Sequence, residues 1–382
     1  MIRKGWQDMK QVTASDIDIP GEIVFTDKTL APIWEKIQAS ERLSFEDGLH
    51  LFDTPDFVAI GNMANYVKRR WSGDNVYFVT NVHVNPTNIC VLTCTFCDFA
   101  KKDITTPGAY EMNMEQILKL ITNEISEVHI VGGHHPTWTF EHYEDMVRTI
   151  HQQYPHTNIK AFTAAEIDFF WRRWKVPPEE ALTRLKAAGL QSMPGGGAEV
   201  FSDRMNKITY PGKAKSQRWL EIHRLAHSLG IPTNATLLYG HLETYEERVR
   251  HLLMLRELQD ETGGFLTFIP LEYQLGDTQL VSRHASPIDD LKTISASRLL
   301  LDNFPHIKAY WVMIGEETAS IALNFGADDL DGTIGEERIA HAAKAASPLG
   351  LARERMVRLI RDAGKIPVER NALYGVVEVY DN

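Results

Sequence analysis

From residue 76 onward, short β-rich runs alternate with amphipathic segments, and this alternation constrains the fold more than any other feature of the sequence. Repeated βα units are typical of a parallel sheet covered by helices. Their number and spacing favour a (β/α)₈ barrel of the TIM type. The expected strands are 76–84, 127–131, 158–163, 190–194, 233–239, 265–270 and 307–313, with an eighth near 323–327.

The segments on either side of the alternating region have a different pattern. Residues 1–75 are expected to form a mainly helical section, residues 76–335 the barrel, and residues 336–382 helices packed on it. Ser44 with Asp47 and Thr244 with Glu247 each have the spacing of a capping box, which marks the start of a helix.

Composition narrows the class of protein. A net charge of −11 argues against a nucleic-acid partner, because phosphate binding requires a concentrated basic surface. No run of 18 apolar residues is present, so we expect no membrane span. The basic start of the chain is not followed by an apolar stretch, which indicates a cytoplasmic protein without a secretory leader.

The three cysteines of the chain lie within one loop directly after the first expected strand. Cys90, Cys94 and Cys97 have the spacing C-x₃-C-x₂-C. Three thiolates on a short loop can each bind a different iron atom of a [4Fe–4S] cube, which leaves the fourth iron without a protein ligand. An odd number of cysteines makes a disulfide framework improbable.

A zinc site or a fully ligated electron-transfer cluster is a weaker interpretation of the same loop than a three-cysteine [4Fe–4S] cluster. A structural zinc site needs a fourth ligand, and His129, His134 and His135 are more than thirty residues further along the chain. A fully ligated electron-transfer cluster usually has four cysteines. A non-catalytic iron–sulfur redox protein remains the alternative of a different class.

The cysteine spacing, with the aromatic Phe96 just before the third cysteine, resembles the radical S-adenosylmethionine (radical SAM) superfamily. The resemblance implies that S-adenosylmethionine chelates the open iron and is cleaved by one electron. It also implies cofactor-binding roles for residues near the expected strand ends: Phe96, Gly132, Gly133, Glu166 and Glu199. Many members have a glutamate after the glycine pair, where this chain has His134.

The resemblance extends over about 290 residues through NPTNIC, EVHIVGGHHP, SMPGGGAEVF and FGADDLDGT. These segments are similar to the branch of the superfamily that serves menaquinone biosynthesis by the futalosine pathway. CDFAKK, KAFTAAEID and NATLLYGH are more similar to the members that make 6-amino-6-deoxyfutalosine than to the cyclic dehypoxanthinyl futalosine synthases. A cyclic synthase or another radical SAM enzyme of the same branch is the alternative.

This branch implies a transferase reaction and its partners. The 5′-deoxyadenosyl group of S-adenosylmethionine would add to 3-[(1-carboxyvinyl)oxy]benzoate, with aryl migration and loss of bicarbonate. An electron donor such as flavodoxin or ferredoxin would reduce the cluster. The two substrate carboxylates need buried polar partners. The candidates are Asn85, Asn88, His135, Asn234 and His241, with Asp329 and Asp331 as further candidates for substrate or adenosine hydroxyls.

Overall fold

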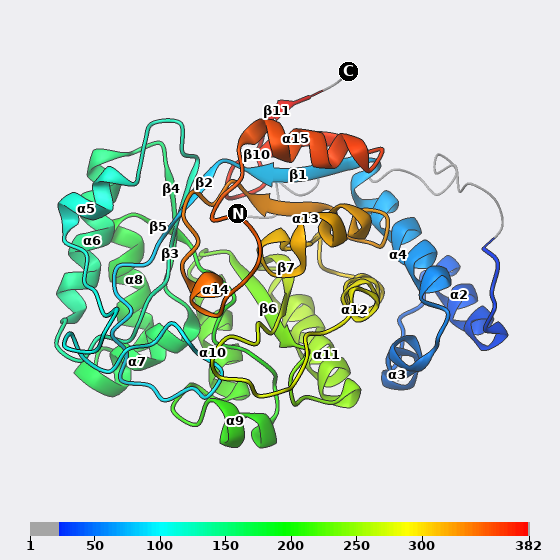
Figure 1. Ribbon diagram of the computed structural model, residues 1–382, viewed down its shortest axis with the longest axis horizontal. Helices are drawn as coiled ribbons and strands as arrows, with labels where there is room; N and C mark the ends of the chain where they lie inside the picture. The colour runs from blue at the N-terminus through cyan, green and yellow to red at the C-terminus, as the bar shows by residue number, and fades with distance from the viewer. Residues whose placement is uncertain (1–22, 381–382) are drawn as a thin grey trace.

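The computed structural model describes residues 23–380, in which helices surround a set of parallel strands (Figure 1). The chain before residue 23, including its basic start, lies outside the described residues. The section that follows is helical and packs against α11 (Tyr245–Thr262) and α12 (Pro287–Leu300). Its elements are η2 (Lys28–Leu30), α2 (Ala31–Gln38), α3 (Phe45–Asp53) and α4 (Phe57–Ser72). α3 begins with the predicted capping box between Ser44 and Asp47.

The strands form three hydrogen-bonded sheets. Their orders are β2-β3-β4-β5, β6-β7-β8 and β11-β10-β1-β9, where β10 is Ile366–Arg370 and β11 is Val376–Val379. All neighbours except β10 and β11 are parallel. The barrel strands are β1 (Asn75–Val79), β2 (Asn81–Val84), β3 (Glu127–Ile130), β4 (Asn158–Ala161), β5 (Leu190–Ser192), β6 (Thr233–Tyr239), β7 (Phe265–Glu272), β8 (His306–Ile307) and β9 (Asp329–Gly332).

Isolated bridges and single hydrogen bonds join these sheets into a closed barrel. A parallel bridge at Met193 joins β5 to β6, and another at Lys308 joins β8 to β9. The His83 N–H donates to the carbonyl of Ile334 at 3.0 Å, so the residues just after β9 pair with β2. With β1 and β2 counted as one bent strand, the predicted (β/α)₈ class is confirmed for the described residues.

Two strand predictions at the end of the barrel were wrong. The apolar run 307–313 forms a strand only at its start, and its last three residues belong to the helix α13 (Trp311–Ala322). An apolar run that is buried in either form does not distinguish a strand from a helix. Residues 323–327 form the turn after α13, and the eighth strand is the acidic segment β9. Its carboxylates are neutralised by Lys308 and Arg370, which a local pattern cannot show.

The C-terminal section contains the expected helices and also two strands. The helices are α14 (Ile339–Ala342) and α15 (Arg353–Asp362), and the strands are β10 (Ile366–Arg370) and β11 (Val376–Val379). The sequence analysis expected helices alone, so the strands are a correction. β10 pairs in parallel with β1 on the outside of the barrel, and β11 pairs with β10 in the antiparallel direction.

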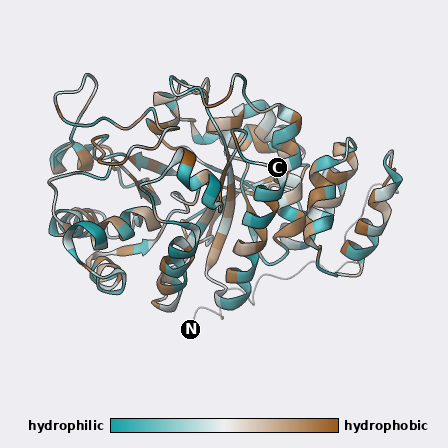
Figure 2. Cartoon of the chain, turned by 90° about the horizontal axis from the view of Figure 1, so that it is seen from below, coloured by the Kyte–Doolittle hydropathy of each residue, from teal (hydrophilic) through white to brown (hydrophobic). Residues whose placement is uncertain are grey.

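The helices between the barrel strands carry hydrophobic and hydrophilic residues side by side, as Figure 2 shows. The capping box predicted at Thr244 opens α11. Pro178 is the first residue of α8, and Gly189 ends this helix with a φ of 122°. The helices are α5 (Met114–Lys119), α6 (Phe140–Gln153), α7 (Ala164–Trp174), α8 (Pro178–Ala188), α9 (Asp203–Thr209), α10 (Ser216–Ser228), α11 (Tyr245–Thr262) and α12 (Pro287–Leu300).

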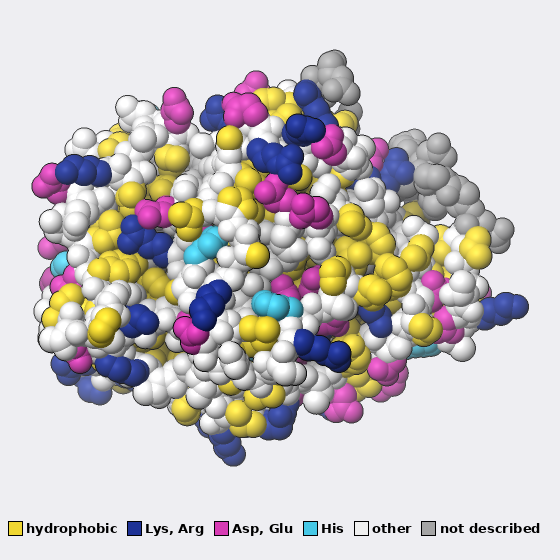
Figure 3. Space-filling model, in the orientation of Figure 1, with side chains coloured by type: hydrophobic (Ala, Val, Ile, Leu, Met, Phe, Trp, Pro, Cys, Tyr) yellow, Lys and Arg dark blue, Asp and Glu magenta, His cyan; other side chains and the backbone are white. Residues whose placement is uncertain are grey.

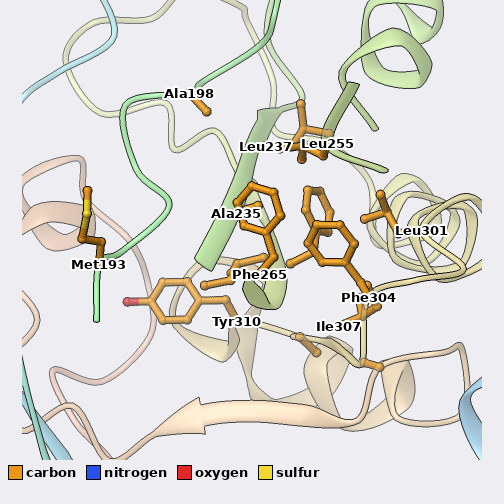
Figure 4. Packing of buried hydrophobic residues seen from close by; sticks show 14 of the residues in the cluster. Met193, Ala198, Ala235, Leu237, Leu255, Phe265, Leu301, Phe304, Ile307 and Tyr310 are labelled. Atoms are coloured by element: carbon orange, nitrogen blue, oxygen red, sulfur yellow. The ribbon is translucent and has the colours of Figure 1, made fainter. Parts of the chain in front are cut away.

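Buried apolar side chains fix β6 and β7 against the outer helices (Figure 4). Leu237, Phe265 and Phe304 are completely buried, and the rings of the two phenylalanines stack with centroids 5.2 Å apart. Burial of one such ring contributes on the order of 2–3 kcal/mol. This packing fixes the position of β6, whose Asn234 and Thr236 line the interior cavity.

Candidate active site

The cysteine loop leaves the C-terminal end of β2 and is held at several points along its length. The Cys90 N–H donates to the Lys101 carbonyl at 2.8 Å, and the Val91 N–H donates to the His134 carbonyl at 3.0 Å. Cys90 is buried, whereas Cys94 and Cys97 are half-buried. The loop therefore presents its thiols from a backbone that the barrel already fixes.

All three cysteines line one cavity of about 290 Å³ at the mouth of the barrel. Most of the other residues that the sequence analysis assigned to cofactor binding or substrate line the same cavity. Its lining includes Phe96, Gly132, Gly133, Glu166, Glu199, Asn234 and Asp331. The structure thus brings together side chains from strands that are far apart in sequence.

Five predicted substrate residues lie outside this lining and have other contacts. The Asn88 side chain bonds the backbone of Gly108 and Tyr110 and so orders the cysteine loop. The others bond as follows: Asn85 donates to the Val131 carbonyl, His135 pairs with Glu111, His241 bonds the Leu238 carbonyl, and Asp329 pairs with Arg370.

The glycine pair after β3 packs directly under the cysteine loop. A Cβ on Gly133 would lie 2.2 Å from the carbonyl oxygen of Ile89, the residue before the first cysteine. A Cβ on Gly195, in the turn after β5, would lie 2.6 Å from the backbone of Ala235. Both positions therefore require glycine, and both leave backbone exposed to the cavity.

Glu199 and Lys213 form an ion pair in the cavity wall next to the cysteines. Glu199 adopts a φ of 46°, a left-handed conformation that is strained for a residue with a side chain. Burial lowers the pKa of Lys213, but the charges of Glu199 and Cys94 raise it by more, so the lysine is cationic. The sequence analysis missed Lys213, because no motif marks a lysine that follows a turn.

Glu166 caps a helix and faces the cavity at the same time. It is the third residue of α7, and its Oε2 accepts a hydrogen bond from the Thr163 N–H at 2.7 Å. Burial raises the pKa of Glu166 to about 7, although the bonds from Thr163 act in the opposite direction. The carboxyl group therefore takes up a proton at a higher pH than an exposed glutamate does.

His134 is an uncharged side chain at the position where many radical SAM proteins have a glutamate. Burial lowers its pKa to about 3, and the ring lies 4.9 Å from that of Phe169. Its Nδ1 is buried and has no hydrogen-bond partner among the described residues. The carboxylates of this wall come instead from Glu166 and Glu199.

Two sequence patterns of known families match the chain. The pattern of the radical SAM superfamily matches residues 84–255, and that of the CofH/MqnC C-terminal region matches residues 262–382. An aminodeoxyfutalosine synthase from Thermus thermophilus is 45% identical and covers 93% of this chain and 98% of its own length. The chain belongs to the radical SAM superfamily.

Further radical SAM relatives support this assignment. An aminodeoxyfutalosine synthase from Streptomyces coelicolor is 41% identical over 91% of this chain and 94% of its own length. A cyclic dehypoxanthine futalosine synthase from the same organism is 35% identical over 92% and 90%. Among solved structures, the hydrogenase maturase HydG from Carboxydothermus hydrogenoformans has a TM-score of 0.71 at 16% identity, covering 91% of this chain and 81% of its own. The last likeness shows the fold.

Radical SAM enzymes use a [4Fe–4S] cluster and S-adenosylmethionine, and the cysteine loop fits this cluster. Within residues 23–380 no three His, Cys, Asp or Glu side chains converge on one metal position. A cube does not require such convergence, because each thiolate binds a different iron. Burial raises the pKa of Cys94 to about 11, while Lys213 acts to lower it, so cluster binding displaces a proton from this thiol.

The outer surface has a mixed charge pattern. In the view of Figure 3, acidic and basic side chains are interspersed with apolar ones over the visible face. Within residues 23–380, every helix is too short or too polar to span a bilayer.

Proposed function

We propose that this radical SAM enzyme is an aminodeoxyfutalosine synthase. The net reaction joins S-adenosylmethionine, 3-[(1-carboxyvinyl)oxy]benzoate and water to give 6-amino-6-deoxyfutalosine, methionine, bicarbonate and a proton. The observation that carries the proposal is the identity of 45% and 41% to two synthases along more than nine-tenths of both chains. Identity to the cyclic dehypoxanthine futalosine synthase is lower, at 35%.

Cys90, Cys94 and Cys97 would hold the cluster, which supplies the electron that cleaves the S–C5′ bond of S-adenosylmethionine. The exposed backbone at Gly132 and Gly133 gives the methionine end of this molecule a close approach to the loop. Acceptors for its ammonium group or ribose hydroxyls are available on Glu166 and Glu199.

The chain contributes a cavity with a mainly apolar surface for the reactive carbon centre. Leu92 and Phe99 line the cavity on the cysteine side, Ile269 and Leu271 line it from β7, and Met313 lines it from α13. Exclusion of water protects such a centre from side reactions. Asn234 and Asp331 are the predicted substrate residues that remain candidates for polar contacts, and flavodoxin or ferredoxin remains the expected electron donor.

Product analysis tests this function directly. Reduced protein with its reconstituted cluster is incubated without oxygen with S-adenosylmethionine and the enol-ether benzoate, and the products are identified by mass spectrometry. We expect aminodeoxyfutalosine and methionine in equal amounts. Free 5′-deoxyadenosine with unchanged enol ether contradicts the proposal. Deoxyadenosine formed only with dehypoxanthine futalosine identifies the cyclic synthase instead.

A further inference from the structure

A row of three side chains lines the same cavity below the cysteine loop. In the strand register His83 on β2 is paired with His129 on β3, and His129 is paired with Lys160 on β4. Paired residues on parallel strands point to the same face of the sheet, and all three residues line the cavity. We call His83, His129 and Lys160 the basal row.

The basal row lies deeper in the barrel than the expected position of S-adenosylmethionine. His129 precedes Gly132 by three residues, and the strands run toward the mouth where the cysteine loop begins. At about 3.3 Å per strand residue, the row is roughly 10 Å below the glycine pair. This depth suits a second molecule that lies between the row and the cofactor.

The basal row has hydrogen-bond donors without protein partners. The Nζ of Lys160 donates to Glu127 Oε1 at 2.5 Å, which is its one hydrogen bond among the described residues. An ammonium has three donors, so two remain for a ligand. Buried donors without a partner destabilise the folded protein, and a ligand that accepts hydrogen bonds removes this cost.

His129 adds a donor in one of its two tautomers. Its Nδ1 lies 3.2 Å from His83 Nε2, and its own Nε2 is buried without a partner in residues 23–380. If the His83 Nε2–H donates to His129 Nδ1, the proton of His129 is on Nε2. Burial lowers the pKa of both histidines, so each ring is neutral near pH 7 and can take part in this chain of bonds.

Carboxylates near the row are already paired. Glu127 is paired with Lys160, and Asp331 with Lys308 at 2.9 Å. Glu337, which also lines the cavity, accepts backbone N–H groups from Ile339 and Ala340. These carboxylates therefore already have protein donors, whereas Lys160 and His129 keep polar nitrogen capacity that no described side chain uses.

We propose that the basal row binds the ring carboxylate of an aryl enol-ether substrate, with Lys160 Nζ and His129 Nε2 as its donors. The inference rests on the proposed function and adds the orientation in which the substrate binds. The enol ether points to the cysteine loop, where its own carboxylate is lost, and the carboxylate that remains in the product points inward. Val131, Leu238 and Ile269 supply an apolar wall for the aromatic ring between the two ends.

Equilibrium binding to the holoenzyme with an oxidised cluster tests the basal row, because the substrate then binds without reacting. Calorimetry compares 3-[(1-carboxyvinyl)oxy]benzoate with 2-phenoxyacrylate, which has the same enol ether and no ring carboxylate. We expect the wild-type protein to prefer the carboxylated ligand. His129→Asn keeps an amide at the Nδ1 position but lacks the Nε2 donor, and should reduce this preference about 10- to 100-fold.

His129→Gln is the matched control, because its amide nitrogen lies near the Nε2 position and should retain the preference. Lys160→Met alone would leave Glu127 charged and unpaired in the barrel, so the two residues are changed together as Lys160→Met with Glu127→Gln. This double variant should also lose the preference while its affinity for 2-phenoxyacrylate and S-adenosylmethionine is unchanged.

The outcomes distinguish a failure of the basal-row proposal from a failure of the proposed function. The basal-row proposal is wrong if the preference survives in both His129→Asn and the double variant. It is also wrong if the variants bind both ligands more weakly by the same factor. Product formation by a wild-type protein that shows no preference overturns the basal row and retains the function. Binding that depends on Lys160 and the ring carboxylate, without aminodeoxyfutalosine under reducing conditions, retains the basal row and overturns the function.

Discussion

The ammonium of Lys213 forms an ion pair with Glu199 and lies 5.0 Å from the ring centroid of Phe96, within the cysteine loop. One cation thus connects the turn after β5 with the loop after β2. Its charge also acts on the thiols of Cys94 and Cys97, whose pKa values burial raises. Lys213 therefore favours the thiolate forms that iron requires.

Replacement of this lysine should weaken cluster binding. In Lys213→Met the thiolates lose a nearby positive charge, and we expect iron retention against a chelator to fall about tenfold. Iron and sulfide content after anaerobic reconstitution measures the effect. Lys215→Met removes an exposed lysine two residues further on and is the matched control. Equal iron content in the two variants contradicts the assigned role.

Each cysteine should be necessary for the cluster but not for the fold. Cys94→Ala leaves two thiolates for a cube that needs three, so the reconstituted variant should lack the absorption of the cluster and all activity. Its circular dichroism should match the wild type, because the loop lies at the mouth of the barrel. Thr93→Ala, an exposed neighbour, should behave as the wild type. Loss of helical signal in Cys94→Ala would point to a structural metal instead.

The two glycines after β3 should differ in their tolerance of a methyl group. In Gly133→Ala the new Cβ meets the Ile89 carbonyl at 2.2 Å, whereas in Gly132→Ala the nearest atom is 3.1 Å away. We expect Gly133→Ala to destabilise the protein by about 1–3 kcal/mol and to displace the cysteine loop, with a smaller effect for Gly132→Ala. Denaturant unfolding and iron content measure the two effects, and the reverse order would contradict the assigned packing.

Stability should depend on pH through Glu166. Burial raises its pKa in the folded protein from the ordinary 4.5 to about 7, so the folded state binds the proton more tightly. Stability from this group is complete below about pH 4.5 and is lost as the pH rises to about 7, by at most about 3 kcal/mol. Glu166→Gln keeps the capping box and should remove this dependence. Parallel pH profiles of unfolding for the two proteins would exclude the effect.

Local sequence signals predicted the parts of the fold that depend on local chemistry. The strand predicted at 233–239 is β6 with the same bounds, because its apolar run is bounded by polar turns and is buried in the sheet. The capping boxes at Ser44 and Thr244 were also found, since each needs only residues three positions apart. The cluster-binding loop was predicted from the spacing of its three cysteines alone.

Features that depend on distant partners were not predictable in this way. β9 is rich in aspartate, which disfavours a strand until Lys308 and Arg370 supply its counter-charges. Lys213 is recognised as a site residue only when the turn after β5 is placed beside the cysteine loop. The basal row exists only because of the register between β2, β3 and β4.

The pairing of Arg370 with Asp329, at 2.7 Å and with both side chains buried, makes the last strands part of the barrel wall. A protein shortened before β10 would keep every cysteine, yet it would expose the outer edge of β1 and leave an acid inside the wall without this guanidinium. In a chimeric enzyme, the barrel and the C-terminal strands should therefore come from the same relative, because this buried ion pair joins the two segments.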